Sequence, residues 1–450
     1  MHARHLFAGS VLAGMLHAVS ATAQQSNLDA LVSRAMAASP TIRSSAARLD
    51  AARARVSPAS ALPDPMLMLG IINQPLGGSS SEGSMTGPPG PDPMTMRMVG
   101  VEQMLPFPGK LALRRRVATH EADAAEAMLE VARRQVGRDV RATYYELSFV
   151  DRALDIVARN QDVMASLVTV TEARYGVGAT GQQDVLQARV EAARLCESAS
   201  ALMEQRRAAL ARLNALLDQP SESAIVATPM PDAITRAAVS SSPGEIRFVS
   251  TALGSRAADS PLRPLTELQD AALRRSPEVR AQDAMIAAQA ARVELARKEV
   301  RPDIGLSVQY GQRGGGLPDM VSATVSIPIP VFRGRKQNQM VVEATSQVAA
   351  LDAERVAATN AIRAEVARLV SDIERDRTRL ALSVKAILPQ SRAALASAIA
   401  SYQAAKVEFL TVLENQATVF TYETEYFRAL TDFATSLAEL ERVVGEEVTR

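Results

Sequence analysis

The sequence predicts a mainly α-helical protein with a small transmembrane β part, built as two tandem copies of one structural unit. Abundant alanine, no tryptophan and only 4% aromatic residues are typical of long, closely packed helices rather than of one large globular core. Several short sequence landmarks occur twice in the same order, which indicates an internal repeat. Short runs of alternating apolar and polar residues precede the longest helical stretches, and such alternation predicts strands.

The start of the chain has the features of a secretory signal peptide. Arg4 precedes an apolar run at residues 6–19, and a small-x-small sequence at residues 21–23 lies just before Gln24. We therefore expect residues 1–23 to be removed on export. The apolar run is too short to span a bilayer, and no later stretch offers the roughly 20 consecutive apolar residues of a membrane helix. The expected destination is the periplasm or the outer membrane.

The composition of the mature chain excludes several classes of function. Removing the signal peptide leaves His120 as the only histidine, so most hydrolytic and zinc chemistry lacks its usual residue. Of the 50 basic residues only Arg4 is lost with the signal, which leaves 49 basic against 49 acidic residues and argues against nucleic-acid binding. No nucleophile–base constellation or phosphate-binding glycine loop stands out, so we expect no enzymatic activity and no cofactor. The single cysteine, Cys196, is expected to be a small buried side chain.

Four landmarks define the repeat. The matching segments are residues 38–43 with 275–280, 63–64 with 302–303, 106–110 with 331–335, and Tyr175 and Val185 with Tyr402 and Val412. The first copy therefore covers residues 24–219 and the second covers residues 264–450. Residues 220–263 are rich in serine, alanine and proline, and we expect them to form a connector packed around the outside of the helices.

Each copy is expected to contain a helical pair, two strands, a very long helix and a shorter returning helix. The long helix of the first copy spans residues 110–174 without an internal proline, which corresponds to a length on the order of 100 Å. A shorter helix returns at residues 182–217, and the second copy repeats this arrangement at residues 336–401 and 407–444. Alanine, leucine and valine at three-and-four spacing favour antiparallel coiled-coil packing. On the helices alone, a soluble coiled-coil rod is an equally good interpretation.

The strands distinguish a pore from a rod. Residues 304–311 and 320–329 alternate between apolar and small polar side chains, and each run is about as long as the 9 to 11 residues of a membrane strand. A hairpin on a soluble core would show the same alternation. The first copy offers a second pair at residues 66–73 and 94–105, joined by a long loop at residues 74–93. Four strands cannot close a barrel, which needs at least about 8, so the barrel must be shared between chains.

This ordered plan resembles the TolC family of outer-membrane efflux proteins over essentially the whole mature chain. The resemblance implies a homotrimer whose 12-stranded barrel lies in outer-membrane lipid and whose helices form a tunnel across the periplasm. It implies a passive exit duct in a tripartite efflux system, together with a periplasmic adaptor protein and an inner-membrane pump. The joint at residues 105–111 and the turn at residues 175–178 resemble those of members that serve tripartite pumps, including the heavy-metal branch.

Two turns, at residues 174–184 and 404–408, are expected to lie together at the far end of the helices. The resemblance implies that these tips meet the hairpins of the adaptor and constrict the resting tunnel. The candidate adaptor contacts are Tyr175, Gly176, Val177, Gly178, Gln182, Ala404 and Ala405. Glycines such as Gly176, Gly178 and Gly181 are equally expected from ordinary turn formation, because they permit a tight reversal.

Four charged residues near the same end are candidates for a gate. We expect some of them to pair between neighbouring helices and hold the tip closed; they are Arg174, Asp184, Lys406 and Glu408. Solvated surface charge is the competing interpretation, since exposed ion pairs contribute only about 0 to 1 kcal/mol.

Methionines are concentrated in the first strand pair. Seven of 17 lie between residues 66 and 104, and thioether sulfur is a soft ligand for monovalent copper or silver. Aligning the copies places Met66 and Met68 on the face of Gly305 and Ser307, towards the lumen. The same alignment places Met96 and Met98 on the face of Val321 and Ala323, towards lipid. Met66 and Met68, with Met85 in the loop, are therefore the candidate metal contacts, and simple apolar packing is the alternative.

Two classes of function follow from these expectations. The first is an efflux duct for heavy-metal cations, either copper and silver or cobalt, zinc and cadmium, with drugs or solvents as the alternative cargo and protein secretion third. The second is a soluble periplasmic coiled-coil adaptor or scaffold. An adaptor is expected to carry one central helical hairpin between β-rich domains, whereas this chain has two hairpins and four short strands.

Overall fold

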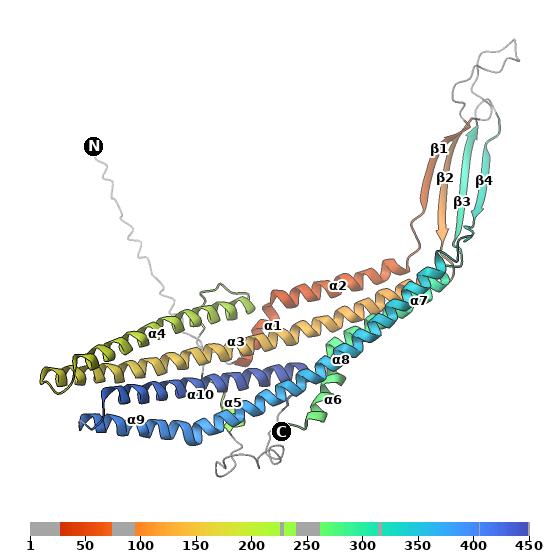
Figure 1. Ribbon diagram of the computed structural model, residues 1–450. Helices are drawn as coiled ribbons and strands as arrows, with labels where there is room; N and C mark the ends of the chain where they lie inside the picture. Colours follow the sequence, from red (N-terminus) through yellow and green to blue (C-terminus); the bar gives the residue numbers. More distant parts are fainter. Residues whose placement is uncertain are drawn as a thin grey trace, which may run out of the picture.

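The computed structural model describes residues 28–73, 95–225, 229–239, 262–313, 317–404 and 406–448. The molecule is elongated: a small sheet lies at one end, long helices lead away from it, and two helical turns lie at the opposite end (Figure 1). The helices of both copies run side by side through the middle of the molecule (Figure 1). The mainly α fold with a small β part is therefore confirmed.

The elements occur in the same order in the two copies. The first copy contains α1 (Leu28–Ala38), α2 (Pro40–Ser60), β1 (Met66–Ile72), β2 (Met96–Leu105), α3 (Lys110–Gly176) and α4 (Gln182–Leu216). After α5 (Asp232–Val239), the second copy contains α6 (Leu265–Arg275), α7 (Pro277–Lys298), β3 (Ile304–Arg313), β4 (Met320–Ser326), α8 (Gln337–Leu382), α9 (Leu388–Gln403) and α10 (Phe409–Val444). The sequence landmarks thus correspond to equivalent structural positions.

The Ser-Pro landmark separates the first two helices of each copy. Pro40 and Pro277 stand at the first helical position, where the missing N–H is one that an α-helix leaves unpaired anyway. In the second copy the backbone N–H of Val279 donates to the hydroxyl of Ser276 at 3.1 Å, which caps the helix. Because proline cannot continue the preceding helix, the chain breaks at this point.

The core lies where the long helices of both copies meet. Tyr144 and Leu147 on α3 are fully buried and pack in one cluster with Phe433 and Leu440 on α10. A second cluster near the helical turns contains Met164. With 67 residues, α3 is on the order of 100 Å long, so it connects the sheet, the main core and the second cluster.

The long helix of the second copy is not the single regular helix that the sequence predicts. α8 ends at Leu382, a π-helical segment occupies Ser383–Ile387, and α9 begins at Leu388. Pro389 has no N–H to donate to a preceding carbonyl, and a wider π turn next to it accommodates that loss. The chain is helical over the range that the sequence predicts, residues 336–401, but the prediction overlooked the interruption at this proline.

The four strands form one antiparallel sheet in the order β1-β2-β3-β4. Met98 on β2 lies opposite Gly70 on β1 and Gly311 on β3, and Gly311 lies opposite Met320 on β4. β4 ends at Ser326 rather than at residue 329. Pro328 and Pro330 cannot donate to a strand ladder, which explains the earlier end.

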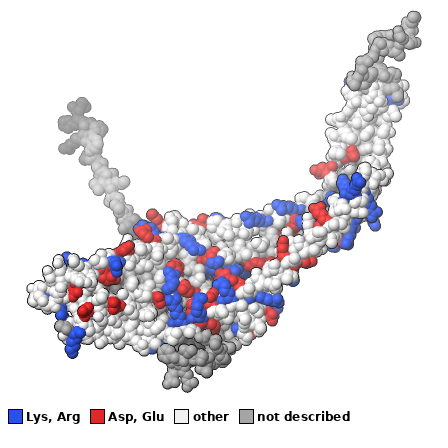
Figure 2. Space-filling model, in the orientation of Figure 1, with Lys and Arg blue, Asp and Glu red and all other residues white. Residues whose placement is uncertain are grey.

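The register gives the sheet an apolar face and a polar face. The apolar face carries Leu67, Leu69, Ile71, Val99, Val101, Ile304, Leu306, Val308, Tyr310, Val321, Ala323 and Val325, with Arg97, Gln312 and Gln103 towards its two ends. The polar face carries Glu102, Ser307, Gln309, Arg313, Ser322, Thr324 and Ser326 together with glycines and methionines. Charges of both signs are mixed over the middle of the helices, whereas the visible side of the sheet is mostly uncharged (Figure 2). An apolar face on a sheet with two open edges is suited to lipid only after the edges are paired.

The register corrects the orientation of two methionines. Met66 and Met68 lie on the polar face, as the sequence predicts, opposite Glu102 and Gly100. Met96 and Met98 lie on this polar face as well, because β3 places Arg313 and Gly311 opposite them. The alignment that put them on the apolar face was wrong by one residue, and a slip of one residue moves a side chain to the other face of a strand.

Cys196 is exposed, contrary to the prediction that it is buried. Its neighbour Leu195 is only 6% exposed and faces α3, so helical geometry directs the next side chain away from that contact. Gln161 on α3 approaches the Cys196 sulfur to 3.7 Å. The thiol is therefore accessible at the surface of the first helical hairpin.

Part of the connector is described. α5 contacts α8 and α10, and Ile234 and Ala238 on α5 are buried in the main core. The predicted signal peptide and the loop at residues 74–93 lie outside the described residues. Within the described part of the chain, no helix is both long and apolar enough to cross a membrane.

Candidate functional site

The turn between α3 and α4 projects from the far end of the first hairpin (Figure 1). Gly178 has a φ of +74°, a conformation that side chains with a Cβ rarely adopt, and its N–H donates to the carbonyl of Tyr175 at 3.0 Å. Tyr175 is 48% exposed and Val177 is 79% exposed. This turn therefore presents an aromatic and an aliphatic side chain to solvent at the end of a rigid helix pair.

The other expected contact residues are close to this surface. Gln182 begins α4 and is exposed, and Ala404 is exposed in the turn between α9 and α10. Ala405 lies outside the described residues. Leu186 and Leu410, which the sequence reasoning did not select, are also about half exposed near the two turns. The sequence feature that could have identified them is an apolar residue directly after another apolar residue that is buried, Val185 or Phe409.

One of the four gate candidates joins the two hairpins. The guanidinium group of Arg174 on α3 donates to the carbonyl oxygen of Tyr402 on α9 and lies 4.5 Å above the centre of its ring. Tyr402 is only 3% exposed and packs against Phe409, with 5.4 Å between ring centres. The cation therefore rests on a buried aromatic pair, which combines a hydrogen bond with a cation–π contact.

The other three gate candidates are not brought together within one chain. The carboxylate of Asp184 accepts a hydrogen bond from the hydroxyl of Thr180 in its own turn. Lys406 and Glu408 are exposed, and neither has an ion-pair partner among the described residues. Sequence reasoning missed Tyr402 as the partner of Arg174, although Tyr402 was already evident as a repeat landmark.

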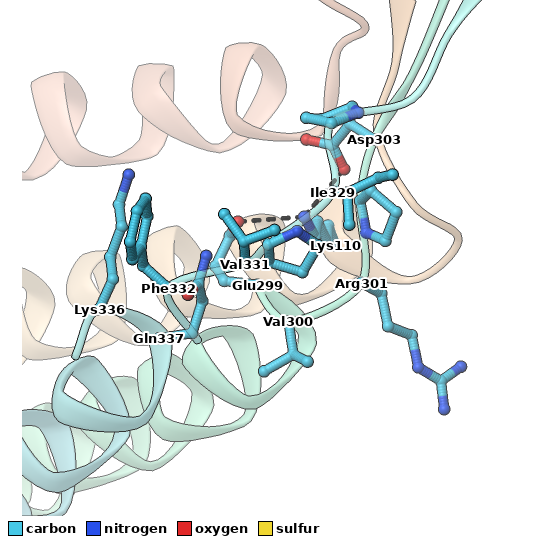
Figure 3. Close-up of a pocket in the computed structure, with 13 residues that line it drawn as sticks. Lys110, Glu299, Val300, Arg301, Asp303, Ile329, Val331, Phe332, Lys336 and Gln337 are labelled. Atoms are coloured by element: carbon cyan, nitrogen blue, oxygen red, sulfur yellow. Dashed lines mark hydrogen bonds and ion pairs between the residues drawn. The ribbon is translucent and has the colours of Figure 1, made fainter. Parts of the chain in front are cut away.

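A buried lysine connects the helices to the sheet. Lys110, the first residue of α3, is 1% exposed, and its ammonium group lies 3.0 Å from Glu299 and 2.9 Å from Asp303 (Figure 3). The backbone N–H of Phe107 donates to the same Asp303 carboxylate at 2.8 Å. These contacts hold the segment before α3 against the segment before β3.

The charges at this joint are coupled. Burial raises the pKa of the Asp303 carboxyl, but the hydrogen bonds from Lys110 and Phe107 outweigh that effect, so the pKa lies below its usual value. A cavity of about 320 Å³ at this joint is lined by Lys110 together with Ile329, Val331 and Phe332 (Figure 3). Val331 and Phe332 are about three-quarters exposed.

The sheet carries the candidate metal contacts. Met66 is 58% exposed on the polar face of β1, and Met68 lies two residues further along the same face. Met85 lies outside the described residues. Among the described residues, no group of three histidine, cysteine or carboxylate side chains is arranged to hold a metal ion.

A sheet with one apolar face, joined to two long helical hairpins, is the architecture expected of one subunit of a channel that continues a membrane barrel into a helical duct. The chain belongs to the outer membrane efflux protein family, whose model matches residues 31–219 and 268–446. It is therefore an outer-membrane efflux channel and not an enzyme. Membership excludes the soluble adaptor or scaffold.

Similar proteins support this assignment. The cobalt-zinc-cadmium resistance protein CzcC of Cupriavidus metallidurans is 22% identical over 341 residues, which cover 75% of this chain and 74% of CzcC. The outer-membrane channel OprN has a TM-score of 0.73 at 21% identity, covering 93% of this chain and 89% of OprN. The outer-membrane protein VceC of Vibrio cholerae has a TM-score of 0.71 at 20% identity, covering 94% of this chain and 96% of VceC. The structural similarities establish the fold.

Proposed function

We propose that this chain forms the outer-membrane exit duct for heavy-metal cations in a tripartite efflux system. Channels of this family are trimeric and work with periplasmic adaptors and inner-membrane pumps. The observation that favours a metal cargo is the similarity to CzcC, a protein named for cobalt, zinc and cadmium resistance. Met66 and Met68 on the polar face are proposed as transient contacts for a soft cation in transit.

Growth of a deletion strain tests the cargo. Loss of the chain is expected to lower the tolerated concentration of one or more of copper, silver, cobalt, zinc and cadmium, and restoring the gene is expected to recover it. Drugs and organic solvents serve as the comparison cargo in the same assay. Sensitivity to drugs with unchanged metal tolerance would contradict the metal assignment and favour drug efflux.

We propose that the resting duct is closed at the helical turns and opens when an adaptor engages them. The contact of Arg174 with Tyr402 supports this, because it ties the α3–α4 hairpin to α9 near the turns. The exposed Tyr175 and Val177 offer the adaptor an apolar surface on the same end. Opening would then require the hairpins to separate, which breaks the hydrogen bond and the cation–π contact together.

Single-channel conductance tests the closed tip. Arg174→Ala is expected to raise the resting conductance in a planar bilayer, because it removes both contacts between the hairpins. Arg189→Ala is the matched control, since Arg189 pairs with Glu172 at an exposed site within the first hairpin alone. Equal resting conductance in the parent and the Arg174→Ala variant would exclude Arg174 as a gate residue.

A further inference from the structure

Four methionines form a group on the polar face of the sheet, in the half away from the helices. This outer methionine band consists of Met68 on β1, Met96 and Met98 on β2, and Met320 on β4. The corrected register is what assembles the band, because it moves Met96 and Met98 to the face of Met68. The same face is otherwise lined mainly by glycine, serine, threonine and glutamine.

Glycines between the methionines leave room for the thioether side chains. Met98 and Met320 both lie opposite Gly311, so no side chain stands between them on β3. Neighbouring strands are about 4.8 Å apart. The sulfur of Met96 lies 2.8 Å from the position that a Cβ of Gly311 would occupy. The methyl group of Met98 lies 3.7 Å from the corresponding position at Gly70. The side chains therefore lie across the glycines, along the surface of the sheet.

Packing against another element does not account for this arrangement. Met320 is 43% exposed, and among the described elements no helix or second sheet packs on the polar face. Methionine is unbranched and flexible, so its thioether can reach over a glycine of the next strand: Met96 lies over Gly311 on the side of Met320, and Met98 lies over Gly70 on the side of Met68. Thioether sulfur is an uncharged soft donor that selects Cu(I) and Ag(I) over harder divalent cations.

We propose that the outer methionine band is a weak binding site for soft monovalent cations, Cu(I) or Ag(I), inside the duct. The inference rests on the proposed function as a heavy-metal duct and names soft monovalent cations as one class of its cargo. Three chains would place three bands around one lumen, close to its outer end. A cation leaving the helical tunnel would exchange between thioethers before release.

Silver uptake by the full-length chain in detergent tests the proposal, with Ag(I) as silver nitrate in chloride-free buffer. All variants carry Cys196→Ser, because the exposed thiol would otherwise dominate silver binding. The test variant replaces the four band methionines by leucine, which preserves size and apolar character. The control variant makes the same change at four exposed helix methionines, Met128, Met203, Met285 and Met340. Bound silver is measured by equilibrium dialysis and elemental analysis.

The test variant is expected to bind silver about tenfold more weakly than the parent, a loss of about 1.4 kcal/mol, while the control variant is unchanged. Zinc and cobalt uptake should be the same in all three proteins. Silver uptake that is equal in the test variant and the parent would overturn the proposal. Conductance of the same samples in planar bilayers separates this failure from failure of the proposed function: a conducting parent without band-dependent silver binding rejects the site alone.

Discussion

Lys110 and Asp303 show how single residues connect the sheet to the helices. The ammonium group of Lys110 is removed from water at the first residue of α3, and two carboxylates compensate for that desolvation. Neither partner is close to Lys110 in sequence, so the contact depends on the two copies packing together. The stability of the joint therefore depends on pH through the carboxyl group of Asp303, whose pKa is lowered in the folded protein.

We predict that Asp303→Asn lowers the thermal stability of the detergent-solubilised protein at pH 7, and that this loss becomes smaller as the pH falls below about 4. The pKa of Asp303 is lower in the folded protein than in the unfolded chain, where it is about 3.9. Its stabilising contribution is therefore fully present above pH about 4 and is lost as the pH falls through the folded value. The expected loss at pH 7 is about 1 to 2 kcal/mol. A melting difference that is independent of pH would contradict the assignment.

Gly178 is the residue on which the first turn depends. Its φ of +74° would strain any side chain with a Cβ, although nothing lies within 4 Å of that position. We predict that Gly178→Ala destabilises the turn by about 1 to 2 kcal/mol. Amide hydrogen exchange over residues 174–184 should become faster by a corresponding factor. Gly176→Ala is the control, because Gly176 ends α3 with ordinary backbone angles and equally open space, and its exchange should not increase.

At the scale of elements, the strand register decides what faces the duct. Period-two alternation identified the four strands, yet the alignment between copies misplaced β2 by one residue. The pairing of Met98 with Gly311 and of Val99 with Tyr310 settles which side chains share a face. Met98 and its neighbour Val99 therefore lie on opposite faces of the sheet, one polar and one apolar.

Cysteine labelling tests this assignment of faces. In a Cys196→Ser background, Met98→Cys is expected to react with a charged, membrane-impermeant thiol reagent when the channel is in a bilayer. Val99→Cys lies on the apolar face and is expected to react at least about tenfold more slowly, since a thiolate does not form readily in lipid. The opposite order of reactivity would show that β2 has the other orientation. Mass spectrometry of the labelled protein gives both rates.

The π-helical segment shows that regular spacing in the sequence does not fix which residues of a helix face its neighbour. Three-and-four spacing predicted continuous helical packing across residues 336–401, and the chain does remain helical there. One proline nevertheless changes the hydrogen-bond pattern and so the phase of the side chains after residue 382. α9 therefore presents a different set of residues to α10 from the set that an unbroken heptad pattern would give.

At the scale of the whole molecule, the open edges of the sheet require a partner. Among the described strands, β1 and β4 each have one neighbour, and the segment that follows β4 exposes Ile329, Val331 and Phe332. An unpaired strand edge cannot remain in lipid. Further copies of the chain would pair these edges and cover the exposed apolar segment.

We predict that the detergent-solubilised protein is a homotrimer, with twelve strands in one barrel. Light scattering with correction for bound detergent should give a mass of three mature chains. Removing detergent should cause aggregation, because the apolar face of the sheet is then exposed to water. A monomer that stays soluble without detergent would contradict both the shared barrel and its place in the membrane.

The sequence indicated some sites better than others. The glycine and aromatic pattern located the turn at residues 175–178, and the charge pattern included Arg174 among the gate candidates. The sequence could not show that Arg174, rather than Asp184, contacts the other hairpin, because the partner of Arg174, Tyr402, is 228 residues away in the other copy. Cys196 was misjudged for a similar reason: exposure on a helix depends on which face its neighbour covers.

The sequence by itself determined the two-copy plan, the strand and helix order, the length of α3 and the need for more than one chain. These follow from local periodicity, proline and glycine positions and a minimum number of strands, all of which are properties of short segments. Only the tertiary structure decided the strand register, the burial of Lys110 between Glu299 and Asp303, and the contact of Arg174 with Tyr402. Each of these joins residues far apart in the chain, and their pairing is set by packing between elements.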